Sequence, residues 1–162
     1  ICACLVGSEM CIRDRYDIAP GLINLEITET ASISARTILL ENMKTLINYG
    51  FTFSLDDFGK GESNLMYIVE MPVSIEKLDY DMLKAFFRSP KAKTVVQAVV
   101  NMAHNMNLKM VAEGIETEEE IQGMSKENID YIQGYYYSCP VPQNDFLEFL
   151  RNNQPVLSSS AE

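Results

Sequence analysis

The spacing of apolar and polar positions changes in a regular way along the chain. The segment "FTFSLDD" (51–57) alternates strictly, which is the period of a β-strand with one buried face. The segment "SARTILLENMKTLINYG" (34–50) repeats apolar residues at helical spacing and ends in a glycine, a common helix stop. Strand-like and helix-like segments therefore follow one another.

The same reading predicts five strands, at 22–28, 51–57, 73–79, 108–114 and 129–137. Helices are predicted at 34–50, 63–70, 80–88, 91–106, from residue 117 onward and at 143–153. Thr117 and Glu120 have the spacing of a capping box, in which each side chain satisfies an exposed N–H at the helix start. Strands separated by helices are typical of a parallel sheet in an α/β fold. Periodicity alone leaves an open sheet and a closed barrel both possible.

Composition narrows the class of protein. With 162 residues, 47% hydrophobic and 22% charged, the chain can form one globular domain or most of one. Its formal charge of −10 argues against binding to a nucleic-acid polymer or to anionic lipid, so an anionic ligand would need bridging cations. No apolar run approaches the ~18 residues that span a bilayer. We therefore expect a cytoplasmic domain, although a longer parent protein could be tethered to a membrane.

The first residues do not share this pattern. The string "ICACLVGSEMCIRDR" has no clear period and resembles translated sequencing-adapter read-through, so residues 1–15 are predicted to be a non-native leader. The domain is then expected at 16–150 and a polar tail at 151–162. The four cysteines are Cys2, Cys4, Cys11 and Cys139. They form no CxxC pair and have no nearby histidine, which does not favour a zinc site.

Candidate chemistry lies where the predicted strands end. These residues are Glu26, Asp56, Asp57, Lys77, Asp79, Glu113, Glu116 and Gln133, with Glu29 just beyond the first strand. Parallel strands deliver their carboxyl ends to one face, so we expect these side chains to converge. Oxygen ligands suit Mg²⁺ or Mn²⁺, and the adjacent carboxylates of Asp56 and Asp57 could bind two neighbouring ions. Gly59 and Gly61 would let the following loop approach a ligand closely.

Each of these residues alone has an ordinary structural explanation. A glutamate in "LEITE" could be a solvated strand end, and "AEGIETEEE" could be only a capped acidic helix start. Lys77 could be a surface lysine, and "IQGYYY" an aromatic strand with a glycine bulge. Their shared position at successive strand ends is what favours function.

Five segments resemble the signature blocks of the EAL domain family, in the family's order and spacing over residues 16–150. They are "LEITET", "LDDFGKGESNL", "IEKLDYDML", "KMVAEGIETEEE" and "YIQGYYYSCPVP". The resemblance implies a TIM-type (β/α) barrel modified by one antiparallel strand. This chain would supply its C-terminal portion, a partial barrel of about five parallel strands with intervening helices. It also implies Mg²⁺- or Mn²⁺-dependent hydrolysis of cyclic di-GMP to linear pGpG in bacterial signalling.

The resemblance also implies a role for each residue. Glu26, Asp56 and Glu113 resemble metal ligands, and Asp57 resembles the ligand of the second metal. Lys77 is similar to the residue that orients or deprotonates the attacking water, and Gln133 to one that lines the water and metal site. The remaining residues, Glu29, Gly59, Gly61, Asp79 and Glu116, would support the site or its loop.

The sequence departs from the family pattern in three places. It contains no Glu-Ala-Leu motif, and the asparagine ligand has no match, although Asn24 lies near Glu26. In the loop, Lys60 replaces a usual small residue and Glu62 a usual aromatic one. The alternative is therefore a degenerate EAL domain that acts as a cyclic di-GMP receptor or a protein-interaction module.

Two further expectations follow from the resemblance. The partners it suggests are cyclic di-GMP, a second copy in a homodimer, and an upstream sensor or GGDEF domain. Because a complete barrel takes ~250 residues, the 162-residue chain is expected to be inactive by itself.

Overall fold

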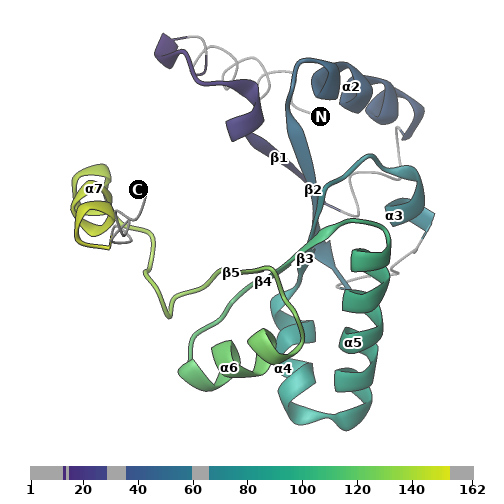
Figure 1. Ribbon diagram of the computed structural model, residues 1–162, viewed down its shortest axis with the longest axis vertical. Helices are drawn as coiled ribbons and strands as arrows, with labels where there is room; N and C mark the ends of the chain where they lie inside the picture. The colour runs from purple at the N-terminus through teal and green to yellow at the C-terminus, as the bar shows by residue number, and fades with distance from the viewer. Residues whose placement is uncertain (1–12, 14, 29–35, 60–65, 154–162) are drawn as a thin grey trace, which may run out of the picture.

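Five parallel strands form one sheet in the computed structural model, which describes residues 13, 15–28, 36–59 and 66–153. The strands, in chain order and in sheet order, are β1 (Asn24–Thr28), β2 (Thr52–Phe58), β3 (Ile75–Leu78), β4 (Lys109–Ala112) and β5 (Tyr131–Ile132). The helices are η1 (Pro20–Leu22), α2 (Arg36–Asn48), α3 (Met66–Glu70), α4 (Tyr80–Arg88), α5 (Pro90–Asn105), α6 (Glu118–Lys126) and α7 (Gln143–Asn152) (Figure 1). The predicted α/β class with five parallel strands is confirmed.

The sheet is wound in one direction. Each strand pairs in parallel with the one before it in the sequence. Because such crossovers are right-handed, a sheet wound this way carries its helices on one face and curls toward the other, as in a (β/α) barrel. The described strands do not close, since β1 and β5 lie at the two edges. The architecture is that of a partial barrel, as predicted.

The helix-covered face holds the core. Leu55 of β2, Leu78 of β3 and Met110 of β4 are at most 1% exposed, and they belong to the same buried cluster as Leu83 of α4 and Val96 of α5. Burying each such side chain contributes about 1.5–3 kcal/mol. This layer fixes the orientation of the strands, so every second residue is turned to the opposite, polar face.

The last strand is shorter than predicted. The segment 129–137 was expected to be extended, but β5 ends at Ile132. A Cβ at Gly134 would lie 2.0 Å from the carbonyl oxygen of Ile115, so the backbones pass too closely there for any side chain. Tyr137 N–H then donates to the carbonyl of Gly134 in a turn. Packing against the neighbouring loop, rather than strand propensity, decides this segment.

Other boundaries agree within a few residues. The predicted capping box is confirmed. The Thr117 hydroxyl accepts from the N–H of Glu120, and the Glu120 carboxylate accepts from the N–H of Thr117. The starts of the predicted helices 34–50 and 63–70, and the end of the predicted tail, lie outside the described residues.

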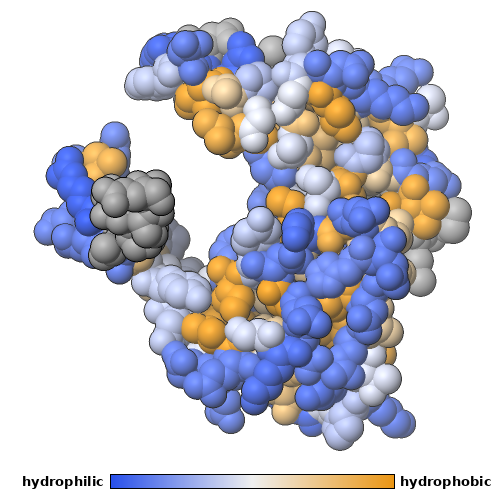
Figure 2. Space-filling view, viewed as in Figure 1, coloured by the Kyte–Doolittle hydropathy of each residue, from blue (hydrophilic) through white to orange (hydrophobic). Residues whose placement is uncertain are grey.

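The helix α7 lies apart from the sheet (Figure 1). None of its residues is buried, and Phe146, Leu147 and Leu150 are 49%, 40% and 44% exposed. Figure 2 shows open space between this helix and the part of the molecule that carries β1. Across the described ranges, no helix is both long enough and apolar enough to cross a membrane.

Candidate active site

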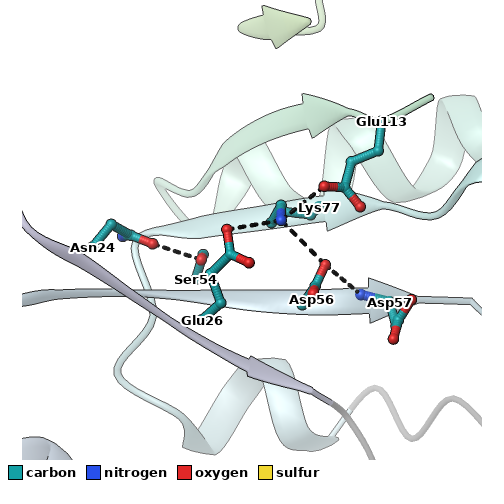
Figure 3. Close-up of polar contacts among 7 residues, drawn as sticks. All are labelled: Asn24, Glu26, Ser54, Asp56, Asp57, Lys77 and Glu113. Atoms are coloured by element: carbon teal, nitrogen blue, oxygen red, sulfur yellow. Dashed lines mark hydrogen bonds and ion pairs between the residues drawn. The ribbon is translucent and has the colours of Figure 1, made fainter. Parts of the chain in front are cut away.

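Lys77 joins three of the predicted carboxylates at the carboxyl end of the sheet. Its Nζ lies 2.8 Å from Glu26 Oε1, 3.3 Å from Asp56 Oδ1 and 2.7 Å from Glu113 Oε1 (Figure 3). The side chain of Lys77 is only 7% exposed. Residues 26, 56, 77 and 113 come from β1, β2, β3 and the end of β4, so the tertiary fold creates this cluster.

Strand register explains why these side chains share one face. Glu26 pairs with Ser54, which pairs with Ile75, two residues before Lys77. Because side chains alternate, Asp56 and Lys77 follow on the same face one layer higher. A slip of one residue would turn every one of them into the apolar core.

A β-bulge brings Asp57 to the same level as Asp56. Leu55 pairs with Glu76 and Phe58 with Leu78, so two residues of β2 stand opposite the single residue Lys77. Asp57 has φ 59°, a conformation that aspartate tolerates better than most residues. Its N–H donates to Asp56 Oδ1 at 3.0 Å. The bulge breaks the strict alternation that would place consecutive side chains on opposite faces, and Figure 3 shows the Asp57 carboxylate beyond Asp56 and turned away from the Lys77 ammonium.

The loop after β2 begins at Gly59. Its φ is 96°, and a Cβ there would lie 2.7 Å from Met82 Cγ, so the position requires glycine. The other residues predicted for this loop and its anchor, Glu29 and Gly61, lie outside the described residues, as do Lys60 and Glu62.

Gln133 lies beside the loop that follows Glu113. Its N–H donates to the carbonyl of Ala112 at 2.9 Å, and its carbonyl accepts from Ile115 N–H at 3.2 Å. The residue is exposed. These backbone hydrogen bonds bring the end of β5 beside the end of β4, and with it Gln133 beside the Glu113 loop.

Two predicted supporting residues make contacts within the scaffold. Asp79 is the N-cap of α4 and accepts from Asp81 N–H at 2.8 Å. Glu116 lies 3.6 Å from Lys84 Nζ. Asn24, the residue near Glu26, binds Thr52 and Ser54 at 3.0 and 2.6 Å, one layer below the Lys77 cluster.

The electrostatics of the site depend on Lys77. Burial opposes its charge, but hydrogen bonds to Glu113 and Glu26 and the charge of Asp56 outweigh burial and raise the pKa of Lys77 above its ordinary value. Burial also raises the pKa of Glu113, and the contact with Lys77 only partly offsets this. With Asp57 counted beside the three carboxylates around Lys77, the four carboxylates exceed the one ammonium by three negative charges when all are ionised.

This donor set fits divalent cations in its chemistry. Carboxylate oxygens are the ligands that Mg²⁺ and Mn²⁺ prefer, and the excess negative charge calls for cations. Within the described ranges, no three acidic, histidine or cysteine side chains are already arranged around one point as metal ligands. The carboxylates converge on the Lys77 ammonium instead. Cys139 is a free, exposed thiol, and the other cysteines lie outside the described residues.

Sequence reasoning did not find the ion pair behind the site or the buried carboxyl on the other face of β3. Lys84 and Glu120 form an ion pair behind the loop that carries Glu113, and Glu76 is a fully buried carboxyl next to Lys77. The sequence shows that Lys84 follows Tyr80 by one helical turn. It does not show the pairing of Lys84 with Glu120, which lies 36 residues further along the chain. Glu76 stands beside Lys77 in the mixed segment "VSIEKLD" (73–79), where nothing in the local pattern sets it apart as a buried residue.

The chain is similar to known proteins in both sequence and fold. The chain is 33% identical to the cyclic di-GMP phosphodiesterase RocR of Pseudomonas aeruginosa, over 83% of this chain and 34% of RocR. It resembles the crystal structure of the EAL domain of Mycobacterium smegmatis DcpA, with a TM-score of 0.83 and 27% identity, covering 94% of this chain and 68% of that one. A manganese/cyclic di-GMP complex of Klebsiella pneumoniae BlrP1 matches with a TM-score of 0.76 and 28% identity, over 83% of this chain and 34% of BlrP1.

The family comparison covers most of the sequence. The family described as "EAL domain" matches residues 8–140. The chain spans about a third of the length of RocR and of BlrP1. The chain belongs to the EAL domain family.

Proposed function

We propose that this chain provides the catalytic face of a phosphodiesterase that hydrolyses cyclic di-GMP to linear pGpG with Mg²⁺ or Mn²⁺. The observation that carries the proposal is the Lys77 cluster, in which one buried ammonium contacts carboxylates from three separate segments. The name of RocR and the BlrP1 complex supply the substrate class and the kind of metal.

The metal would be held by Glu26, Asp56, Asp57 and Glu113. When bound, divalent ions supply an activated water and neutralise charge on the phosphodiester. The bulge at residues 56 and 57 supports two sites, because it offers two carboxylates at one level of the sheet. We assign Gln133, whose backbone is bonded to the Glu113 loop, to the lining of the same region.

Lys77 keeps these carboxylates at fixed positions and adds positive charge where a dianionic dinucleotide must bind. A charged ammonium is suited to orienting a water or a phosphate oxygen, which supports the orienting role among the two that the resemblance implies. We further propose that a second copy and an upstream sensor or GGDEF domain are partners of the complete protein.

The test is hydrolysis by the complete gene product. Cyclic di-GMP is incubated with Mg²⁺, Mn²⁺ or a chelator, and the linear product is followed by chromatography while nucleotide affinity is measured by calorimetry. We expect pGpG to accumulate only with metal. Tight binding of the nucleotide with no product under either metal would contradict the proposal and support a receptor.

A further inference from the structure

Helix α4 braces the loop that carries Glu113. Tyr80, the first residue of α4, packs directly onto Gly114, where a Cβ would lie 2.3 Å from the tyrosine ring. Gly114 has φ 71° and follows Glu113 immediately. Lys84 lies one turn further along α4, with its Nζ 4.9 Å from the centroid of the Tyr80 ring. Both residues thus act from one side of the helix.

An ion pair connects α4 to the backbone of the same loop. Lys84 Nζ hydrogen-bonds to Glu120 Oε1, and the two side chains are 16% and 11% exposed. The other oxygen of Glu120 accepts from the N–H groups of Glu116 and Thr117, at 2.8 and 3.3 Å. One oxygen of Glu120 therefore binds Lys84 and the other binds the loop. Loss of the Lys84 contact would free the Glu120 carboxylate to move and would weaken its hydrogen bonds to the two loop amides.

Helix α4 also begins close to Lys77 along the chain. Strand β3 contains Lys77 and ends at Leu78. Helix α4 starts two residues later, at Tyr80, and Asp79 is its N-cap. Lys77 Nζ and Glu113 Oε1 lie 2.7 Å apart, and both residues are thus connected to α4. Lys77 is linked to α4 through the chain, and Glu113 through Tyr80, Lys84 and Glu120.

We infer that Lys84 and Glu120 are positioning residues for the hydrolysis, acting by holding the Glu113 loop against α4. The inference rests on the proposed function for its kinetic consequence, but the brace itself can be observed without activity. Small displacements of a reacting group lower the rate more than substrate binding, so the loss is expected in kcat.

Lys93 supplies a matched control. Its Nζ lies 5.2 Å from the centroid of the Phe86 ring of α4 and 3.2 Å from Glu127 Oε1, so Lys93, like Lys84, combines a ring contact with an ion pair. Glu127 is the C-cap of α6, at the opposite end from the loop. Lys93→Met therefore removes an ion pair of the same kind, from a lysine that is 49% rather than 16% exposed, without touching residues 113–117.

The experiment compares Lys84→Met, Lys84→Arg and Lys93→Met in the complete gene product. Steady-state hydrolysis of cyclic di-GMP gives kcat and KM, and hydrogen exchange measures opening of residues 114–117. We expect Lys84→Met to lower kcat about tenfold, to change KM by less than about threefold and to speed loop exchange. Lys84→Arg should keep most of the wild-type kcat and most of the wild-type protection of the loop from exchange. Lys93→Met should resemble the wild type in both quantities.

Several outcomes would overturn the inference. One is a wild-type kcat together with wild-type loop exchange in Lys84→Met. The other is a fall in kcat in Lys93→Met as large as that in Lys84→Met. If Lys84→Met does not fold, Glu120→Gln replaces it, because glutamine still accepts from the loop amides but loses the ion pair; unchanged exchange there would also count against the brace. If the wild type does not hydrolyse cyclic di-GMP, the proposed function fails, while loop exchange still decides the brace.

Discussion

The two faces of β3 treat a carboxyl group in opposite ways. On the polar face, Lys77 contacts three carboxylates that remain partly accessible, between 19% and 52% exposed. On the helix-covered face, Glu76 is 0% exposed and neither of its oxygens has a hydrogen-bond partner. Burial raises the pKa of Glu76 to about 7. One face neutralises carboxylates with an ammonium, and the other does so by favouring the protonated acid.

This difference separates function from stability. Charge on the polar face is what can hold cations and a phosphodiester, so its removal should affect rate. The Glu76 carboxyl is fully buried and neither of its oxygens has a hydrogen-bond partner, so its ionisation should affect unfolding and not chemistry.

The largest expected effect is loss of the ammonium. In Lys77→Ala, kcat should fall by about a hundredfold or more, while nucleotide affinity survives because the metal ligands remain. Steady-state kinetics and calorimetry measure the two quantities. Lys109→Ala, which removes an exposed lysine at the other end of the sheet, is the control. Equal losses in affinity and rate would instead identify a lysine that clamps phosphate.

The bulged aspartate comes next. Asp57→Asn keeps a residue that tolerates φ 59° and removes only the charge, so Mn²⁺ affinity should weaken and turnover should fall about tenfold to a hundredfold. Calorimetric titration with Mn²⁺ alone tests the first part without relying on activity. Asp17, with φ 49°, allows the matched control Asp17→Asn. Unchanged metal affinity in Asp57→Asn would remove it from the proposed ligand set.

The buried acid should make stability depend on pH. Because the pKa of Glu76 is raised in the folded state, its favourable contribution is complete below about pH 4.5 and is lost as pH rises through about 7. The free energy of unfolding should therefore fall by about 3 kcal/mol across this range. Urea unfolding at several pH values measures this fall, and Glu76→Gln should remove most of it while kcat stays near the wild-type value. An identical pH slope in Glu76→Gln would contradict the account.

The smallest expected effect concerns Asp130, at the amino end of the sheet. The change in unfolding free energy with pH should have the opposite sign to that of Glu76. Burial opposes ionisation of Asp130, but hydrogen bonds from Lys109, the N–H of Met110 and His104 lower its pKa to about 2. Its contribution is present above about pH 4 and is lost as pH falls toward 2. Asp130→Asn should cost about 1–2 kcal/mol at pH 7, after allowance for solvent screening, and little at pH 2. Equal costs at both pH values in urea unfolding would be evidence against this assignment.

The sequence by itself determined the alternation of strands and helices, the capping box at Thr117 and the identity of the clustered carboxylates. These features depend on periodicity and on contacts within a few residues, which can be read along the chain. Lys77, Glu26 and Glu113 could be assigned to one site because parallel strands share a carboxyl end.

Only the tertiary structure decided how those residues are used. The bulge that brings Asp57 level with Asp56 depends on the register with β3, and the early end of β5 depends on the contact of Gly134 with Ile115. The burial of Glu76 and the pairing of Lys84 with Glu120 likewise join segments distant in sequence. Local propensity carries no information about such contacts, because their free energy comes from packing between elements that meet only after folding.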